Sequence, residues 1–316
     1  MRNLFVRTAV FILLLGVLLY GTQCLLLWGL RSAESPPFGF MNRIIKGQIN
    51  SNILIIGSSR GYANYDGNII HSVTNRSCFN MAVDGTQLDS HLALLRTYLS
   101  HNSVPEVLVV DLDLSSLCFT YKIYSSFEFV PYLDERPLYQ WLITKDSSFW
   151  KRKYLPLYSF SIYGMFLTKP ALLALFGLQH DQPDRRMNGF LGRDASWDSS
   201  FDEFKKGNLK GISYAISNKN VENLRAILSE CKQRRISAFL VYSPAYHELN
   251  DVILNKREII DIYRKKSNEF GVPFLDYSNS EICKNKANFY NSHHLNKQGA
   301  KKFSETLASY LRNKCL

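Results

Sequence analysis

The chain has 316 residues, of which 46% are hydrophobic and 21% are charged, and this composition excludes disordered, collagen-like and low-complexity proteins. Its length allows one large domain or two modest ones. The formal net charge of +11 indicates an anionic partner such as phospholipid, acidic polysaccharide or nucleic acid.

Residues 1–30 are predicted to form a short cytoplasmic tail and a transmembrane anchor. No charged residue occurs from Thr8 to Leu30, a stretch long enough, as a helix, to cross the roughly 30 Å core of a bilayer. The alternative is a cleavable signal peptide, but its apolar region is usually about 7–15 residues long and ends in small residues, whereas Arg31 follows here. Because Arg2 and Arg7 precede the apolar stretch, we expect the N-terminus inside and the rest of the chain outside the cytoplasm.

Short apolar strands alternate with amphipathic helices after a juxtamembrane linker over residues 31–50. Strands are predicted at 52–56, 78–82, 107–112, 236–242 and 272–276, and helices at 87–98, 221–234, 252–270 and 297–311. The strand at 52–56 ends in a continuous apolar run, which is typical of a strand buried on both faces, and the strand at 107–112 is predicted to be buried as well. Residues 51–316 are therefore predicted to form an α/β domain in which helices cover both faces of a parallel sheet.

Residues 115–215 interrupt this alternation and are predicted to form an insertion. They contain 21 of the 42 Phe, Trp and Tyr residues of the chain. The two interpretations are an additional hydrophobic core and a lid whose rings stack on sugars. Within the insertion, residues 160–178 are nearly apolar but include Lys169 and Pro170, which favours a buried or interfacial helical hairpin and leaves a second membrane span as the alternative.

Two segments carry residues suited to chemistry. Gly57-Ser58-Ser59-Arg60 directly follows the first strand, and ligands of doubly wound sheets bind at the carboxyl ends of strands. Asn291-Ser292-His293-His294 precedes the last helix. A histidine held near a serine acts as a base for nucleophilic catalysis, and a side-chain acceptor three positions earlier orients it. A metal site is not indicated, because no cluster of Asp, Glu or Cys surrounds the histidines and no Cys-x-x-Cys pair occurs.

Together these segments resemble the SGNH (GDSL-like) hydrolase superfamily. Gly57-Ser58-Ser59 corresponds to the first sequence block of that family, and Asn80–Gly85 supplies the glycine of its second block. Asn291–His294 matches the last block. The resemblance covers residues 52–114 and 216–313, and it implies a three-layer, flavodoxin-like parallel sheet.

The resemblance also implies the roles of individual residues. Ser59 would be the nucleophile, His294 the base and Asn291 the residue that orients the base. The backbone amides of Ser59 and Gly85 would form the oxyanion hole. Arg60 is a candidate substrate contact, with a salt bridge as the alternative use of its charge.

The anchor, the Gly-Ser-Ser-Arg turn and the His-Leu-Asn-x-x-Gly ending resemble in particular the membrane-anchored proteins of alginate O-acetylation and teichoic-acid D-alanylation. This likeness implies a serine esterase or O-acyltransferase that acts on acyl groups, acetyl above all, of a cell-envelope or exported polysaccharide. No cofactor is expected. The expected partners are the membrane, the acylated glycan and a multi-pass membrane acyltransferase, and the expected compartment is the periplasm or cell surface of a bacterium.

Two departures from the family pattern keep a second function open. Asn291 stands where the family has Asp, and it cannot stabilise an imidazolium by charge. After the strand at 107–112, Asp113 is present but the asparagine of the family is missing, and loss of such an oxyanion donor typically costs about 10²–10³ in rate. The second function is a catalytically inactive subunit that binds glycan or scaffolds a polysaccharide-modification complex.

Nucleotide and nucleic acid are disfavoured as ligands. Gly57–Gly61 fits neither the dinucleotide-binding pattern nor the P-loop pattern. The anchor, and the lack of a basic stripe interleaved with aromatic residues, disfavour nucleic-acid binding.

Overall fold

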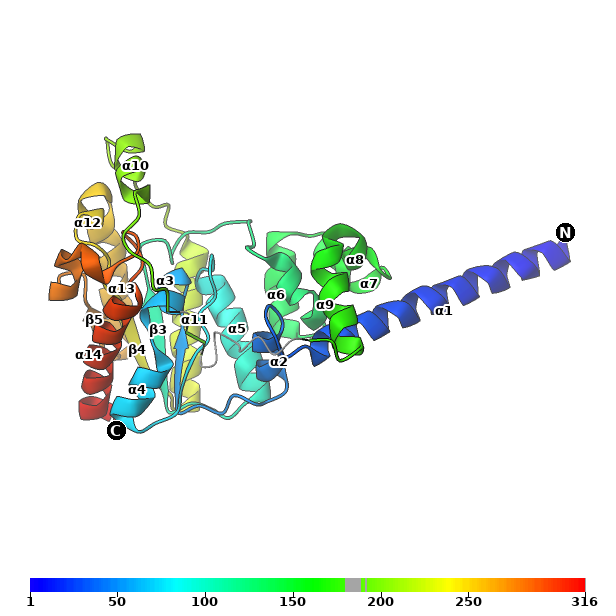
Figure 1. Cartoon of the computed structure of the whole chain (residues 1–316), viewed down its shortest axis with the longest axis horizontal. Coiled ribbons are helices and arrows are strands. Elements are labelled where there is room, and N and C mark those ends of the chain that lie inside the picture. The colour runs from blue at the N-terminus through cyan, green and yellow to red at the C-terminus, as the bar shows by residue number, and fades with distance from the viewer. Residues whose placement is uncertain (180–188, 191, 316) are drawn as a thin grey trace. The chain divides into compact units, whose positions relative to one another are not determined.

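The computed structural model describes residues 1–179, 189, 190 and 192–315 (Figure 1). The chain divides into two compact units. Unit 1 contains Met1–Lys46 and Tyr121–Asp184, and unit 2 contains Gly47–Thr120 and Arg185–Leu316. The predicted insertion 115–215 is thus shared between the two units, and its residues Tyr121–Asp184 belong to the same unit as the N-terminal segment.

A five-stranded parallel sheet forms the centre of unit 2. Its strands are β1 (Ile53–Ile56), β2 (Cys78–Asn80), β3 (Val107–Leu112), β4 (Ser237–Tyr242) and β5 (Phe274–Asp276). They are arranged in the order β2-β1-β3-β4-β5, which is the flavodoxin-like order. Each strand lies within or overlaps a predicted strand, and the predicted fold class is confirmed.

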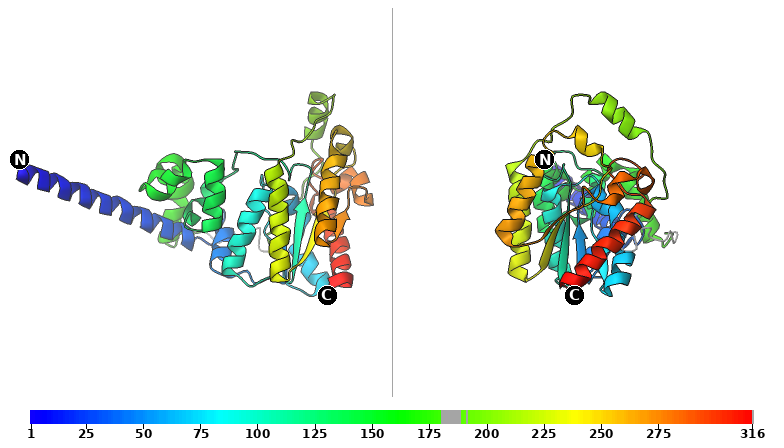
Figure 2. Two further views of the ribbon diagram at one scale, coloured as in Figure 1. Left: turned by 180° about the vertical axis from the view of Figure 1, so that it is seen from behind. Right: turned by 90° about the vertical axis from the view of Figure 1, so that its left-hand side faces the viewer.

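Helices cover both faces of this sheet (Figure 2). On one face α4 (Gly67–Thr74) packs against α14 (Lys297–Cys315), and on the other α11 (Asn218–Arg234) packs against α5 (Leu88–His101) and α13 (Lys256–Phe270). The shorter helical segments of unit 2 are α3 (Ser59–Asn64), α10 (Ser200–Gly207), α12 (Leu249–Val252), η2 (Glu281–Lys284) and η3 (Lys286–Asn288). The sheet is therefore the middle one of three layers.

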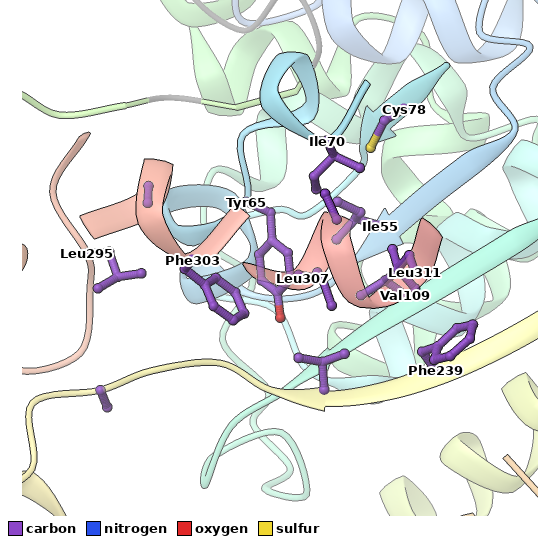
Figure 3. Packing of buried hydrophobic residues seen from close by; sticks show 14 of the residues in the cluster. Ile55, Tyr65, Ile70, Cys78, Val109, Phe239, Leu295, Phe303, Leu307 and Leu311 are labelled. Carbon is purple, nitrogen blue, oxygen red and sulfur yellow. The ribbon is translucent and has the colours of Figure 1, made fainter. Parts of the chain in front are cut away.

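Buried hydrophobic side chains of the sheet and of α14 form the core beside α14 (Figure 3). Ile55 of β1, Val109 of β3 and Phe303 of α14 belong to one buried cluster. Tyr65 packs edge to face on Phe303, with ring centroids 5.1 Å apart. The hydroxyl of Tyr65 donates to Oδ1 of Asp111 at 2.6 Å. This core therefore holds the carboxyl-terminal part of β3 in place.

Part of the aromatic-rich region joins the same core. Phe201 of α10 is buried, and its ring centroid lies 6.0 Å from that of Trp197 and 6.1 Å from that of Tyr246. For Phe201 the core interpretation therefore holds, since a buried ring offers no face to a sugar.

Unit 1 is helical. It contains α1 (Arg2–Ser32), α2 (Gly39–Ile45), η1 (Ser126–Tyr132), α6 (Arg136–Lys145), α7 (Phe149–Tyr154), α8 (Tyr158–Tyr163) and α9 (Met165–Leu175). Among the described residues, α1 alone is long and apolar enough to cross a membrane, a property that signal sequences share. The segment 160–178 contains the end of α8 and all of α9, which have 6 and 11 residues, so neither is long enough to span a bilayer.

The C-terminal third of α1 is part of the core of unit 1. Leu30 packs in one buried cluster with Phe160 of α8 and Leu167 of α9. Gly29 permits this approach, because a Cβ there would lie 2.5 Å from the carbonyl oxygen of Ala171. The same helix is exposed along residues 2–21. Within α1, only the C-terminal third therefore packs closely against other parts of unit 1.

We predict that Gly29→Leu destabilises unit 1 whereas Gly16→Leu, on the exposed part of the same helix, does not. The larger side chain at position 29 collides with α9, and overpacking of this kind costs about 1–3 kcal/mol. A Cβ at Gly16 meets nothing within 4 Å. Proteolysis of the full chain in detergent should release peptides of residues 154–179 faster for the first variant. Equal release rates for the two variants would contradict the packing described.

Candidate active site

Ser59 lies at the carboxyl end of β1, where it is the first residue of α3. Two glycines permit the tight turn from strand to helix. A Cβ on Gly57 would lie 2.8 Å from Cβ of Asp111, and a Cβ on Gly61 would lie 2.8 Å from Cβ of Ala82. The backbone of the turn can therefore approach β3 and the segment after β2 only without these side chains. Ser59 itself is half-buried.

His294 lies in the segment before α14 and contacts Ser59, which precedes it by 235 residues in the sequence. Its Nε2 lies 2.8 Å from Oγ of Ser59. Its Nδ1 lies 2.9 Å from Oδ1 of Asn291. The three residues that the sequence predicted as a catalytic set thus form a continuous hydrogen-bonded chain. Both distances lie within the range expected of a nucleophile, its base and an orienting group.

Asn291 fixes which nitrogen of His294 carries the proton. Oδ1 of Asn291 accepts the backbone N–H groups of His293 at 3.1 Å and of His294 at 3.0 Å. Because both groups are donors, the oxygen of the amide and not its NH₂ must point toward them. The same oxygen therefore accepts Nδ1–H of His294, which leaves Nε2 with a lone pair for the hydroxyl proton of Ser59. The imidazole is held in the tautomer that a general base requires.

Tyr290 supports the ring of His294. The two rings are stacked, 3° from parallel, with centroids 5.2 Å apart. The guanidinium of Arg193 lies 5.1 Å from the centroid of Tyr290. This stack restricts rotation of the imidazole, and the sequence analysis did not identify it. The spacing of Tyr290 four residues before His294 carries no signal of such a contact.

The environment of His294 favours its neutral form. Burial, together with the neighbouring His293 and the cation of Arg60, lowers the pKa of His294 from its ordinary 6.5 to about 3, although Asp113 acts in the opposite direction. His294 is therefore unprotonated, and able to accept a proton, throughout the physiological pH range.

Gly85 lies in an exposed turn after β2 and has a φ of +68°, a conformation that favours glycine. One hydrogen bond joins this turn to the segment before Ser59, and another closes the turn. The N–H of Val83 donates to the carbonyl of Gly57 at 3.1 Å, and the hydroxyl of Thr86 donates to the carbonyl of Val83 at 2.6 Å. The participation of the Gly85 amide in an oxyanion hole stays a prediction.

A cavity of about 230 Å³ opens beside Ser59 and His294. Its further lining is Arg60, Asp113, Leu114, Ser115, Tyr214, Tyr242, Leu249 and His293. Asp113 accepts the hydroxyl of Ser58 at 2.6 Å and that of Ser115 at 2.7 Å. Sequence reasoning identified the stretch after β3 only by its missing asparagine. This stretch follows a strand parallel to β1 and therefore lies at the same sheet edge as Ser59. That position was the signal that could have placed Asp113 in the site.

Arg60 is almost fully buried, with 3% of its surface exposed, although it lines the cavity. Its guanidinium donates to the carbonyl oxygen of Ser243 and lies 4.6 Å from the ring centroid of Tyr242. These contacts hold the side chain of Arg60 at the carboxyl end of β4. Direct contact with a substrate stays a prediction.

In the described part of the chain, no three or more His, Cys, Asp and Glu side chains are grouped so that they could hold a metal ion. Ser59, His294 and Asn291 form a hydrogen-bonded chain, which presents a hydroxyl next to a neutral base.

No protein-family model matches the chain, and no curated protein matches it. One similar solved structure, described as a "putative acylhydrolase" from Bacteroides fragilis, has 11% identity and a TM-score of 0.40 over 83% of this chain and 86% of that one. Another, described as a "putative platelet activating factor" from Streptococcus pneumoniae, has 12% identity and a TM-score of 0.43 over 96% and 99%. Because both TM-scores lie below 0.5, the function has to be inferred from the site itself.

We predict that the reaction of Ser59 with a fluorophosphonate probe keeps its rate from pH 8 down to about pH 5. A base whose pKa is depressed stays unprotonated as the pH falls through 6.5, the value at which an ordinary histidine loses half of its basic form. The measurement is the rate of probe attachment against pH, with circular dichroism to show that the protein stays folded. A midpoint at or above pH 6.5 would contradict the environment described for His294.

We predict that Asn291→Asp raises the midpoint of the acid limb by about 1–3 pH units, because a carboxylate this close favours the imidazolium. The rate on the alkaline plateau should rise as well. Asn285→Asp is the matched control, since Asn285 caps η3 with the same kind of contact and does not touch His294. An unchanged pH profile in Asn291→Asp would show that Asn291 does not face the imidazole.

Proposed function

We propose that the protein is a serine-dependent acyl-transfer enzyme of the SGNH hydrolase type. The observation that carries this proposal is the hydrogen-bonded chain from Ser59 through His294 to Asn291, in which the tautomer of the imidazole is fixed. A serine and a histidine that merely face solvent do not need such a fixed orientation. Their position at the carboxyl edge of a parallel sheet agrees with this role.

The proposed reaction has two halves. Oγ of Ser59 attacks the carbonyl carbon of an ester while Nε2 of His294 takes the hydroxyl proton. The tetrahedral intermediate collapses, and the departing alcohol takes that proton from His294. Water or a sugar hydroxyl then attacks the acyl-serine and gives its proton to His294. The second collapse releases an acid or a new ester and returns the proton to Ser59. The amides of Ser59 and Gly85 are the proposed donors to the oxyanion.

The size and lining of the cavity support a short acyl group. A volume of about 230 Å³ leaves little room for a long hydrocarbon chain. Asp113 and Arg60 also make part of the wall strongly polar. Acetyl is the acyl group that we propose.

The proposed substrate is an acylated polysaccharide of the cell envelope, with the site outside the cytoplasm. Support comes from the formal net charge of +11, which favours an acidic polymer, and from α1. Because Leu30 of α1 packs into the core of unit 1, cleavage behind α1 would remove part of that core. We therefore propose that α1 is retained as an anchor and does not act as a cleaved signal. A multi-pass membrane acyltransferase is the proposed partner.

A second candidate function is an inactive subunit that binds or scaffolds glycan. It is favoured by Asn291, since the amide gives orientation without the negative charge that an aspartate would provide. The two candidates differ in one measurable property, the reactivity of Ser59.

We predict that a fluorophosphonate attaches to the purified full chain, and that Ser59→Ala abolishes and His294→Ala strongly reduces the attachment. Loss of a triad base typically lowers the rate by several powers of ten. Ser72→Ala is the matched control, because Ser72 is exposed and donates to the carbonyl of Ile69 far from the catalytic chain. Probe attachment is measured by intact mass. A folded native protein that does not react would favour the inactive subunit.

A further inference from the structure

Unit 1 contains a groove that the proposed reaction does not use. Its volume is about 330 Å³, and it is bounded by α1 and by segments of η1, α7 and α8. Tyr20, Cys24 and Leu27 of α1 give it a wall with mostly apolar character. Arg152 and Lys153 of α7 line it as well. One groove therefore combines a predominantly apolar wall with basic side chains.

The basic side chains are not fully neutralised by their neighbours. Nη1 of Arg152 donates to Asp146 at 2.9 Å, but its buried Nε has no hydrogen-bond partner among the described residues. The ammonium of Lys153 lies 4.1 Å from the ring centroid of Tyr139. α7 has three consecutive basic residues and no acidic one. Arg31 also lines the groove and is paired with Asp134, another lining residue, as Arg152 is paired with Asp146. Three basic side chains and one aspartate line the groove, so the charge of its lining is positive and suits an anion.

The α8–α9 hairpin beside this groove exposes large apolar side chains. They are Ile162, Met165, Phe166 and Phe176, which are 53%, 68%, 66% and 71% exposed. Exposed apolar groups of this size, on two consecutive short helices and the residue after them, are typical of a surface that contacts another apolar phase.

The packing of α1 indicates that this apolar phase is a membrane. Residues 8–21 are exposed and uncharged and, as a helix, cover about 21 Å of the roughly 30 Å hydrocarbon core of a bilayer. Packing in unit 1 begins immediately afterwards, where Oε1 of Gln23 accepts the N–H of Leu157 at 2.7 Å. It continues to Glu34, whose N–H donates to Gln179 at 3.0 Å. The predicted span Thr8–Leu30 therefore includes the packed part of α1, and it places the groove and the hairpin at the boundary of the membrane.

We propose that the groove of unit 1 holds the head group of an anionic phospholipid whose acyl chains lie along α1, and that the α8–α9 hairpin rests in the membrane surface. A lipid is the occupant that meets both requirements, an anionic head for Arg152 and Lys153 and a hydrocarbon chain for the apolar wall. Basic side chains beside a span attract anionic lipids. This site is independent of the reaction proposed for Ser59.

The test uses the full chain in phosphatidylcholine vesicles that contain a trace of a photoactivatable lipid with a diazirine in its acyl chain. The head group of this probe is either phosphatidylglycerol or phosphatidylcholine. After illumination, mass spectrometry maps the attached lipid. We expect attachment within residues 154–179 as well as within α1, and more from the phosphatidylglycerol probe. Lys153→Gln should reduce that excess about fivefold, since one basic residue at the surface contributes about that factor.

Lys122→Gln is the matched control, because it removes the same charge from unit 1 but Lys122 does not line the groove. It should leave the excess unchanged. Attachment confined to α1 would overturn the proposal for the hairpin. Equal attachment by the two probes, or equal effects of the two lysine substitutions, would overturn the proposed head-group site. None of these results depends on reactivity at Ser59, so the lipid site and the acyl-transfer function can fail separately.

Discussion

The geometry of the site depends on the burial of one cation, Arg60, beneath the carboxyl edge of the sheet. Its guanidinium donates to the carbonyl of Ser243 after β4 and lies over the ring of Tyr242. Burial lowers the pKa of Arg60, but Tyr242 and the carboxyl groups of Asp111 and Asp113 outweigh it and raise the pKa. A buried cation needs such compensation, because its desolvation costs several kcal/mol. The ends of β3 and β4 are thereby held to the helix that begins with the nucleophile.

The two aspartates of this cluster respond to burial in opposite ways. Burial raises the pKa of Asp111 to about 6, even though Arg60 and the hydrogen bond from Tyr65 act against it. Burial also acts to raise the pKa of Asp113, but Arg60 and hydrogen bonds from hydroxyl groups outweigh it and lower the pKa. Near neutral pH the firmly ionised carboxylate is therefore Asp113, the one that lines the cavity. Both carboxyl groups are buried, and Asp113 differs in the hydrogen bonds that it accepts from Ser58 and Ser115, which favour its charged form.

The elements that sequence could predict are those encoded locally. Strand β1 is a continuous apolar run. The glycine-containing turn directly after it predicts that a serine lies at the carboxyl edge of the sheet. The pairing of His294 with Asn291 follows from their spacing. The stack of Tyr290 on His294 depends on side-chain packing that no local pattern encodes. Unit 1 combines two distant segments of the chain, and the fit of Gly29 against α9 is one of the long-range contacts within it that composition cannot reveal.

The site separates two tasks that an aspartate performs together in a serine triad. Asn291 orients the imidazole and selects its tautomer, because two backbone N–H groups fix its amide oxygen. It provides no charge, so the imidazolium that forms during attack must be stabilised from elsewhere. Among the described groups, Asp113 is the one whose attraction raises the pKa of His294, whereas His293 and Arg60 lower it. Loss of the triad aspartate therefore need not trap the wrong tautomer here, and the cost that remains is electrostatic.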